Sequence, residues 1–339
     1  MMSRRSARAV AFCLVALVAS VGCADDAMLE RTQRNMGKLR SLRGVLVEHG
    51  VLPSGEMRSE VRYRKPDQFI SRVLSPESYA GVTIAVAHGQ LVLFYPKANY
   101  AVVFDSMPAT TAEGAQRLIA RAYKHDQSTF RYELGGGGTV AKLPVVNLSY
   151  TAKHQGHAHV SGMVQVYDKV SLPLAGKLHF IGGAEYGYRY ESVELNTDLA
   201  EADFTVALPK NVILSRWDLG SPGVPEPDMR SLANFGIATP TLPPGFTLER
   251  IVRQEGPVPA FTTIYRSGDA WLLLSMWKDL GIAPASEDHG IPVSLPSGKG
   301  RLVVGPAISS YTFSLRGTKY VLTANLPFDE LLEVARTID

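Results

Sequence analysis

The 339-residue sequence contains only two cysteines, and both lie near its N-terminus. Cys13 falls inside the first apolar segment and Cys23 directly follows that segment. We therefore expect no disulfide within the remaining chain, although the compartment inferred below is oxidising. The folded part must be stabilised by apolar cores without covalent cross-links.

A net charge is also missing once the N-terminal segment is set aside. Residues 1–22 contain three of the 35 Lys and Arg residues and none of the 32 Asp and Glu residues, so the remainder is neutral. A neutral chain has no general attraction for phosphate backbones. The composition therefore argues against a nucleic-acid partner.

No apolar run has the comfortable length of a membrane span. The run from Ala9 to Gly22 follows three arginines, which is typical of a secretory signal peptide that ends at residue 23. Ser20-Val21-Gly22-Cys23 approaches a bacterial lipobox, in which Cys23 would be acylated, and cleavage after Ala24 is the alternative. We expect a periplasmic protein anchored by lipid to the outer membrane or, less favoured, the inner membrane.

Catalytic motifs are missing as well. Neither Gly-x-Ser-x-Gly nor His-Glu-x-x-His occurs, and Gly135 to Gly138 lack the Gly-Lys-Ser/Thr of a phosphate loop. We expect those four glycines to form a flexible hairpin loop. Asp168 and Asp203 are explained by turn formation and strand termination, so the sequence predicts no enzyme and no cofactor.

The stretch from Arg58 to Phe104 contains about five short runs of β-branched and aromatic residues, separated by Pro and Gly. This pattern is typical of consecutive antiparallel strands. The early runs alternate, as in Val61 and Tyr63 against Arg62 and Arg64, whereas the later runs at 91–95 and 100–104 are apolar on both faces. One face of this sheet must then be covered, and the other must meet a second sheet or line an apolar cavity.

Two amphipathic segments are predicted to be helices that accompany this sheet. Residues 27–43 place apolar side chains at helical spacing, and a second helix at about 111–124 is expected to cover the apolar face. Further strands are predicted at these ranges: 45–48, 129–134, 145–151, 160–167, 177–181 and 186–195.

The chain divides into two predicted domains. The first domain is expected over 27–215. Residues 216–244 are rich in Pro and Gly, which predicts a linker. Residues 245–339 form a smaller α+β domain with a final helix at 328–338 and strands at these ranges: 246–252, 261–266, 270–277, 299–304, 309–315 and 318–325.

This layout resembles a known family. Asp168-Lys169-Val170-Ser171-Leu172-Pro173-Leu174, the run Tyr190 to Asn196, and Asp203-Phe204 are similar to the closing elements of LolA-type lipoprotein carriers, over about residues 28–207. The resemblance implies an antiparallel half-barrel with covering helices.

The two-domain order is more specifically similar to the MucB/RseB group of periplasmic regulators of envelope-stress sigma factors. Leu242 to Phe246, Tyr265 to Asp269 and Ala324 to Ile338 fit the C-terminal domain of that group. The resemblance implies a lipid- or lipoprotein-binding protein that acts through a protein partner. The lipobox-like Cys23 and the Pro-rich linker depart from that group, so a specific partner is not carried over.

A lipid-binding role needs an apolar surface that its own side chains leave unfilled. A single alkyl methylene contributes about 0.8 kcal/mol when buried. The alternative is that the same side chains simply form core. The candidate residues are Val61, Tyr63, Phe69, Ile84, Leu93, Tyr100, Val102 and Phe104, with Leu118 and Ile119 from the covering helix.

Three histidines, His154, His157 and His159, lie close together between two predicted strands. Imidazoles suit Cu, Zn and Ni. No carboxylate or thiolate lies in the segment, and a solvated turn explains the residues equally well. No metal site is predicted.

The sequence therefore predicts an envelope protein that binds an acyl chain or a lipoprotein, as a carrier or as a regulator of the MucB/RseB type. Its expected protein partner is an anti-sigma factor or another envelope protein. The alternatives are a pure protein-interaction module whose cavity is filled and, less favoured, a metal chaperone.

Overall fold

A computed structural model describes residues 38–52, 55–65, 68–108, 128–154, 157, 159–233, 235–254, 259–279, 290–304 and 308–338, together with Asn35, Leu118 and Arg121. Their secondary structure is mainly strand, arranged in two sheets. No helix within these ranges is long and apolar enough to cross a membrane.

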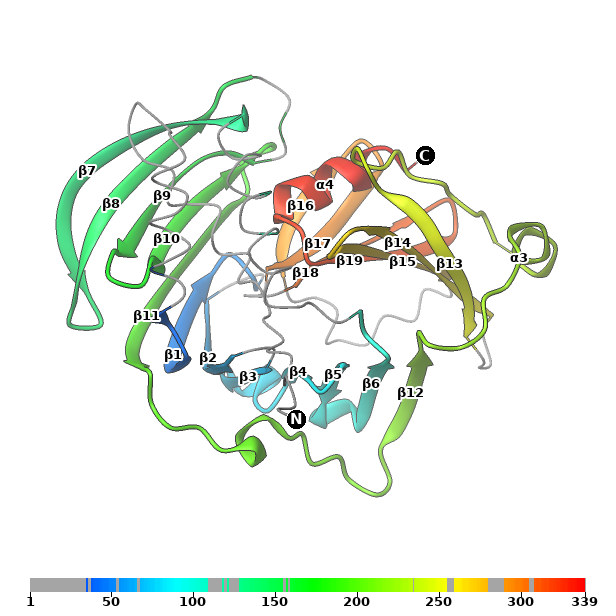
Figure 1. The fold of residues 1–339 in the computed structure, drawn as a ribbon, viewed down its shortest axis with the longest axis horizontal. Helices are drawn as coiled ribbons and strands as arrows, with labels where there is room; N and C mark the ends of the chain where they lie inside the picture. The colour runs from blue at the N-terminus through cyan, green and yellow to red at the C-terminus, as the bar shows by residue number, and fades with distance from the viewer. Residues whose placement is uncertain are drawn as a thin grey trace, which may run out of the picture.

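The larger sheet has twelve strands in the order β12-β6-β5-β4-β3-β2-β1-β11-β10-β9-β8-β7. The sheet is open, since β12 and β7 are its two edges. It curves around the smaller sheet as a half-barrel (Figure 1). Its strands are β1 (Ser41–His49), β2 (Glu56–Arg64), β3 (Gln68–Ser75), β4 (Thr83–Ala87), β5 (Gln90–Tyr95), β6 (Tyr100–Asp105), β7 (Phe130–Val140), β8 (Leu143–Ala152), β9 (His159–Tyr167), β10 (Leu172–Phe180), β11 (Glu185–Leu195) and β12 (Ile213–Asp218).

The chain returns to this sheet after β11 and adds the edge strand β12. After β11, residues 196–212 cross the outside of the sheet and include the short helix η4 (Glu201–Phe204). β12 then pairs in parallel with β6, whereas the neighbouring strand pairs are antiparallel. The short helices η2 (Glu77–Tyr79) and η3 (Pro96–Ala98) lie between strands of the same sheet.

The smaller sheet has seven strands in the order β13-β14-β15-β19-β18-β17-β16. One of its faces packs on α4 (Phe328–Arg336), where Leu331, Leu332, Val334 and Ala335 are buried. The helix α3 (Glu226–Leu232) precedes the sheet, whose strands are β13 (Thr247–Gln254), β14 (Ala260–Ser267), β15 (Ala270–Lys278), β16 (Ile291–Leu295), β17 (Gly298–Val304), β18 (Ser309–Leu315) and β19 (Thr318–Ala324).

The fold class predicted from the sequence is confirmed: an open antiparallel half-barrel is joined to a smaller α+β unit. The limits 27–215, 216–244 and 245–339 stay predictions, while the strands of the two sheets end at Asp218 and begin at Thr247. Most of the two predicted helices at 27–43 and 111–124 lies outside the described residues.

Two local predictions were wrong. Gly135 to Gly138 lie inside β7 and pair with β8 through a register shift, so they are not a loop. The turn falls instead at Ala141 and Lys142, whose φ values of 48° and 65° suit a tight two-residue hairpin. Residues 41–43 belong to β1 rather than to the end of the first helix.

Candidate functional site

The strand register places eight predicted lipid-binding residues on one face of the larger sheet, which we call the inner face. Tyr63 lies opposite Phe69, and Phe69 lies opposite Val86, next to Ile84 on the same side of β4. Ile84 lies opposite Leu93, and Leu93 opposite Val102. Because side chains alternate along a strand, Val61, Tyr100 and Phe104 share this face.

Burial separates these residues into two groups. Val61, Tyr63 and Phe69, on β2 and β3, are 4%, 2% and 7% exposed and belong to the main core. Ile84, Leu93, Tyr100, Val102 and Phe104, on β4 to β6, are only half-buried. The second group therefore keeps apolar surface that the fold does not fully cover.

The smaller sheet packs on one end of the second group. Ile84, Leu93 and Phe104 contact a cluster that contains Val252, Ile264, Trp271 and Leu273 of the smaller sheet. Phe104 lies 5.2 Å from Trp217 of β12, and Trp217 lies 5.8 Å from Trp277 of β15, measured between ring centroids. An aromatic series thus joins the two sheets at this end.

The other end of the same strands is more open. Tyr95 and Tyr100 stack with their ring centroids 6.2 Å apart, and both are half-buried. Ile213, opposite Tyr100 on β12, is 64% exposed. From Phe104 to Tyr100, β6 therefore runs from a packed interface to an accessible apolar rim.

Of the two predicted residues from the covering helix, Leu118 is described and Ile119 is not. Leu118 is 6% exposed and belongs to the same core cluster as Val61 and Tyr63. Arg121 forms a two-point ion pair with Glu330 of α4, in which its Nε lies 3.2 Å from Oε2. Of this predicted helix, Leu118 thus lies in the main core and Arg121 contacts the second unit.

The inner face also contains polar groups that the sequence did not predict. Tyr186, Tyr188 and Tyr190 alternate along β11, and the hydroxyl of Tyr186 donates a hydrogen bond of 2.8 Å to Oε1 of Glu48 on β1. Burial raises the pKa of Glu48 to about 7, against the smaller opposing effect of this hydrogen bond. The sequence signal for this polar group was a tyrosine at every second position of the strand. The same pattern is also typical of ordinary core residues.

The opposite, outer face of the larger sheet is covered by the returning segment. Phe204 is 3% exposed and packs with Ile70 and Ala85, and the Arg64 guanidinium lies 5.3 Å from the centre of its ring. This contact covers Ile70 of β3 and Ala85 of β4. Around Ile70 and Ala85 the outer face is therefore covered, whereas Leu74 at the end of β3 is 47% exposed.

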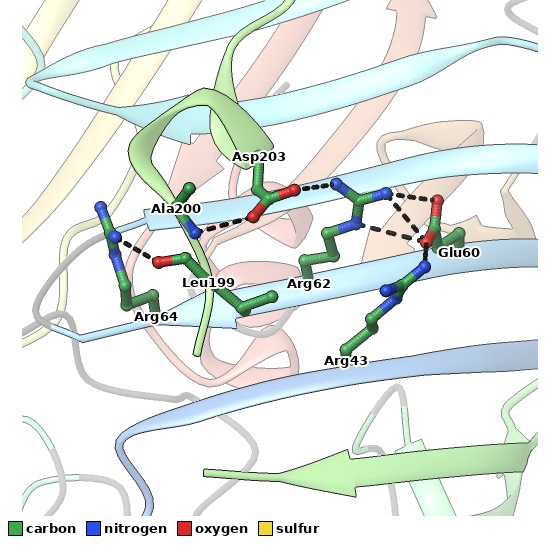
Figure 2. Close-up of polar contacts among 7 residues, drawn as sticks. All are labelled: Arg43, Glu60, Arg62, Arg64, Leu199, Ala200 and Asp203. Atoms are coloured by element: carbon green, nitrogen blue, oxygen red, sulfur yellow. Dashed lines mark hydrogen bonds and ion pairs between the residues drawn. The ribbon is translucent and has the colours of Figure 1, made fainter. Parts of the chain in front are cut away.

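Charged side chains fix that segment in place (Figure 2). Asp203 accepts hydrogen bonds from Arg62 Nη1 at 2.7 Å and from the backbone N–H of Ala200 at 2.8 Å. Arg62 also pairs with Glu60, which lies 3.2 Å from Arg43. Asp203 thus has a structural role, but it anchors the returning segment and does not end a strand as the sequence interpretation had it.

Two of the three clustered histidines, His154 and His157, have different surroundings. His154 is exposed, whereas His157 turns toward Glu333 of α4, with Nδ1 3.6 Å from Oε1. Within the described ranges, no group of three His, Cys, Asp or Glu side chains could hold a metal ion. Cys23, the predicted lipidation site, lies outside those ranges.

Comparison with known proteins gives likeness at the level of fold. No family model matches the chain, and no curated protein matches it. A structure of MucB is 17% identical, covers 94% of this chain and 98% of its own, and has a TM-score of 0.49. The complex of MucA and MucB from Pseudomonas aeruginosa shows 18% identity, coverage of 92% and 96%, and a TM-score of 0.45.

A LolA superfamily protein from Nitrosomonas europaea is 14% identical, covers 55% of this chain and 99% of its own, and has a TM-score of 0.27. The predicted likeness to MucB-type and LolA-type structures is thereby confirmed. At these identities and TM-scores it carries no argument about a ligand or a partner, which must come from the site itself.

Proposed function

We propose that this protein is an envelope protein that binds the acyl chain of a lipid or lipoprotein on its inner face. The observation that supports the proposal is the half-buried apolar row on β4 to β6, in front of the second sheet. Its members are Ile84, Leu93, Tyr100, Val102 and Phe104.

The energetics suit reversible binding. Each buried methylene contributes about 0.8 kcal/mol, so ten methylenes contribute roughly 8 kcal/mol before the cost of ordering the chain. About 8 kcal/mol net would correspond to a micromolar dissociation constant, and the ordering cost weakens it further. Such an affinity fits a carrier or a sensor, which must release its ligand.

We propose that the second sheet transmits ligand binding to a protein partner. Its residues Val252, Ile264 and Leu273 share one apolar cluster with inner-face residues of β4 to β6. A chain that enters along Val102 toward Phe104 would compete for this contact and alter the surface presented to a protein partner. The sequence resemblance to envelope-stress regulators motivates an anti-sigma factor or another envelope protein as that partner.

The same proposal assigns the molecule a location and a mode of action. Acylation of Cys23 would tether the chain to a periplasmic membrane surface, the outer membrane being favoured. The protein would bind and release its ligand without catalysis and without a cofactor.

A second candidate function has its own support. Leu91 is 7% exposed beneath the second sheet, and Trp271 and Leu273 are also buried there. If this packing extends along the row in solution, the inner face is a filled core. The molecule would then be a protein-interaction module.

Binding of a fluorescent long-chain fatty acid tests the first function against the second. The full chain carrying Cys23→Ala is purified without detergent and titrated with the probe. We expect micromolar binding that is lost in Leu93→Asp and weakened in Val102→Thr, which preserves shape. Leu214→Asp is the matched control, because Leu214 is 44% exposed and pairs with Ala101 on the outer side. Absence of binding by the parent chain would favour the interaction module.

A further inference from the structure

A group of polar side chains lies within the apolar inner face, on the three neighbouring strands β2, β1 and β11. The register aligns Met57, Glu48 and Tyr188 in one row and Ser59, Leu46 and Tyr190 in the next. We call Glu48, Ser59, Tyr186, Tyr188 and Tyr190 the inner polar patch. Core residues Val61 and Tyr63 adjoin it along β2.

Two hydroxyls of this patch have no hydrogen-bond partner among the described residues. Ser59 is 1% exposed and Tyr188 is 8% exposed, and within that part of the chain neither Ser59 Oγ nor the Tyr188 hydroxyl makes a hydrogen bond. A buried polar group without a partner costs about 1–3 kcal/mol. Tyr186, by contrast, is satisfied by Glu48.

The Tyr188 hydroxyl is held in a defined position. Its ring lies across Gly176 of β10, where a larger residue would not fit, since a Cβ at that position would stand 2.6 Å from the ring. The ring of Tyr186 stacks on it with centroids 5.7 Å apart. Burial raises the pKa of Tyr188, so its hydroxyl keeps its proton and stays a donor.

The charges around the patch select against an anionic ligand. The inner positions of β1, β2 and β11 contain no Lys or Arg, while Arg58 and Glu191 pair on the outer face. Glu48 adds a carboxyl group to the inner side. The patch therefore offers hydrogen-bond donors in an apolar setting without a compensating cation on these strands.

We propose that the Tyr188 hydroxyl, held over β10, binds an acyl-ester carbonyl, as in the diacylglyceryl end of a lipid or lipoprotein. An ester carbonyl is a neutral acceptor attached to apolar chains, so it matches an unpaired donor surrounded by aliphatic and aromatic side chains. A free fatty carboxylate fits less well beside Glu48. This inference rests on the proposed function and specifies the ligand's linkage.

Matched lipids test the inference. The full chain carrying Cys23→Ala is titrated with a fluorescent diacylglycerol and with the dialkyl ether of the same chain length, which lacks both carbonyls. We expect the ester to bind roughly five- to tenfold more tightly, as about one hydrogen bond would give. Tyr188→Phe should reduce this preference while ether binding is kept.

Tyr311→Phe is the control, because the Tyr311 hydroxyl donates to the Val293 carbonyl in the smaller sheet. It should keep the preference. Equal binding of ester and ether by the parent chain would overturn the inference and leave acyl binding standing, whereas binding of neither lipid would overturn both. Repeating the titration with an S-diacylglyceryl-cysteine peptide separates the sources: tighter binding of the peptide indicates a lipoprotein, and equal binding indicates a simple lipid.

Discussion

On strands β4 to β6 both faces of the larger sheet have apolar residues, yet the two faces of the sheet end in different states. On the outer face, Phe204 covers Ile70 and Ala85, and Asp203 fixes the covering segment through Arg62. On the inner face, the apolar row of β4 to β6 stays half-buried, and the patch on β1, β2 and β11 retains hydroxyls without a partner among the described residues. The chain thus completes one face by itself and leaves the other incompletely satisfied.

This difference is the basis for proposing the inner face as the binding site. A ligand gains little binding free energy on a face whose apolar groups are buried and whose polar groups are hydrogen-bonded. It gains more where apolar side chains are half-buried and hydrogen-bond donors are unpaired. Substitutions on the outer face should therefore affect stability, and substitutions on the inner face should affect binding more than stability.

The largest expected effect on stability comes from removing the Phe204 ring, which covers the outer face. Phe204→Ala removes a ring that is 3% exposed and should lower the free energy of unfolding by about 3–5 kcal/mol. Val102→Ala, on the half-buried inner row, should cost about 1 kcal/mol. Urea unfolding of both variants measures the contrast, and equal costs would contradict the assignment of the two faces.

The next effect depends on pH and comes from Glu48. Its pKa rises from 4.5 in the unfolded chain to about 7 in the folded one, so between these values the folded state holds more protons. Stability should fall as the pH rises from about 4.5 through 7, by up to roughly 3 kcal/mol. Glu48→Gln should remove this component, as thermal melts at pH 5 and pH 8 would show.

A control on the outer face separates this effect from general titration. Glu191 pairs with Arg58 and is 45% exposed, and Glu191→Gln should keep the pH dependence of the parent chain. If Glu48→Gln keeps it as well, Glu48 is not the group responsible.

A smaller effect is expected from the ion pair in Figure 2. Asp203→Asn weakens the contact with Arg62 and the hydrogen bond to Ala200 N–H, which should cost about 1 kcal/mol. Glu77→Gln, in a pair with Lys97 where Glu77 is 91% exposed, should have almost no effect. Denaturation at low and high salt checks both, since only the first change should reduce the salt dependence.

The smallest effect on stability is expected from Tyr188→Phe. The variant removes a hydroxyl that no described residue pairs with and leaves the shape unchanged, so the free energy of unfolding should stay within about 0.5 kcal/mol of the parent or rise. A loss above about 2 kcal/mol in chemical unfolding would show that the hydroxyl has a structural partner.

The strands were predictable because alternation and turn residues are local signals. Val61 and Tyr63 against Arg62 and Arg64 indicated both a strand and its two faces, and the register confirms that arrangement. The runs at 91–95 and 100–104 indicated strands without indicating faces, since both of their sides are apolar. Their allocation depends on segments far along the chain, namely Phe204 on one side and the smaller sheet on the other.

The inner polar patch was not predictable for the same reason. Glu48 and Tyr186 are 138 positions apart, and no local pattern joins them. The glycines of β7 gave a local signal that led to a wrong prediction. Glycine is typical of loops, but it is also tolerated in an edge strand that pairs on one side.

Native mass spectrometry tests most directly whether the inner face holds an acyl ligand. The full chain with Cys23→Ala is expressed in a bacterial periplasm and purified without detergent, next to Leu93→Asp and Leu214→Asp. We predict an added mass of lipid size on the parent chain and on Leu214→Asp, and its absence from folded Leu93→Asp. A bare polypeptide mass for all three chains, with no uptake of added lipid, would contradict the proposal.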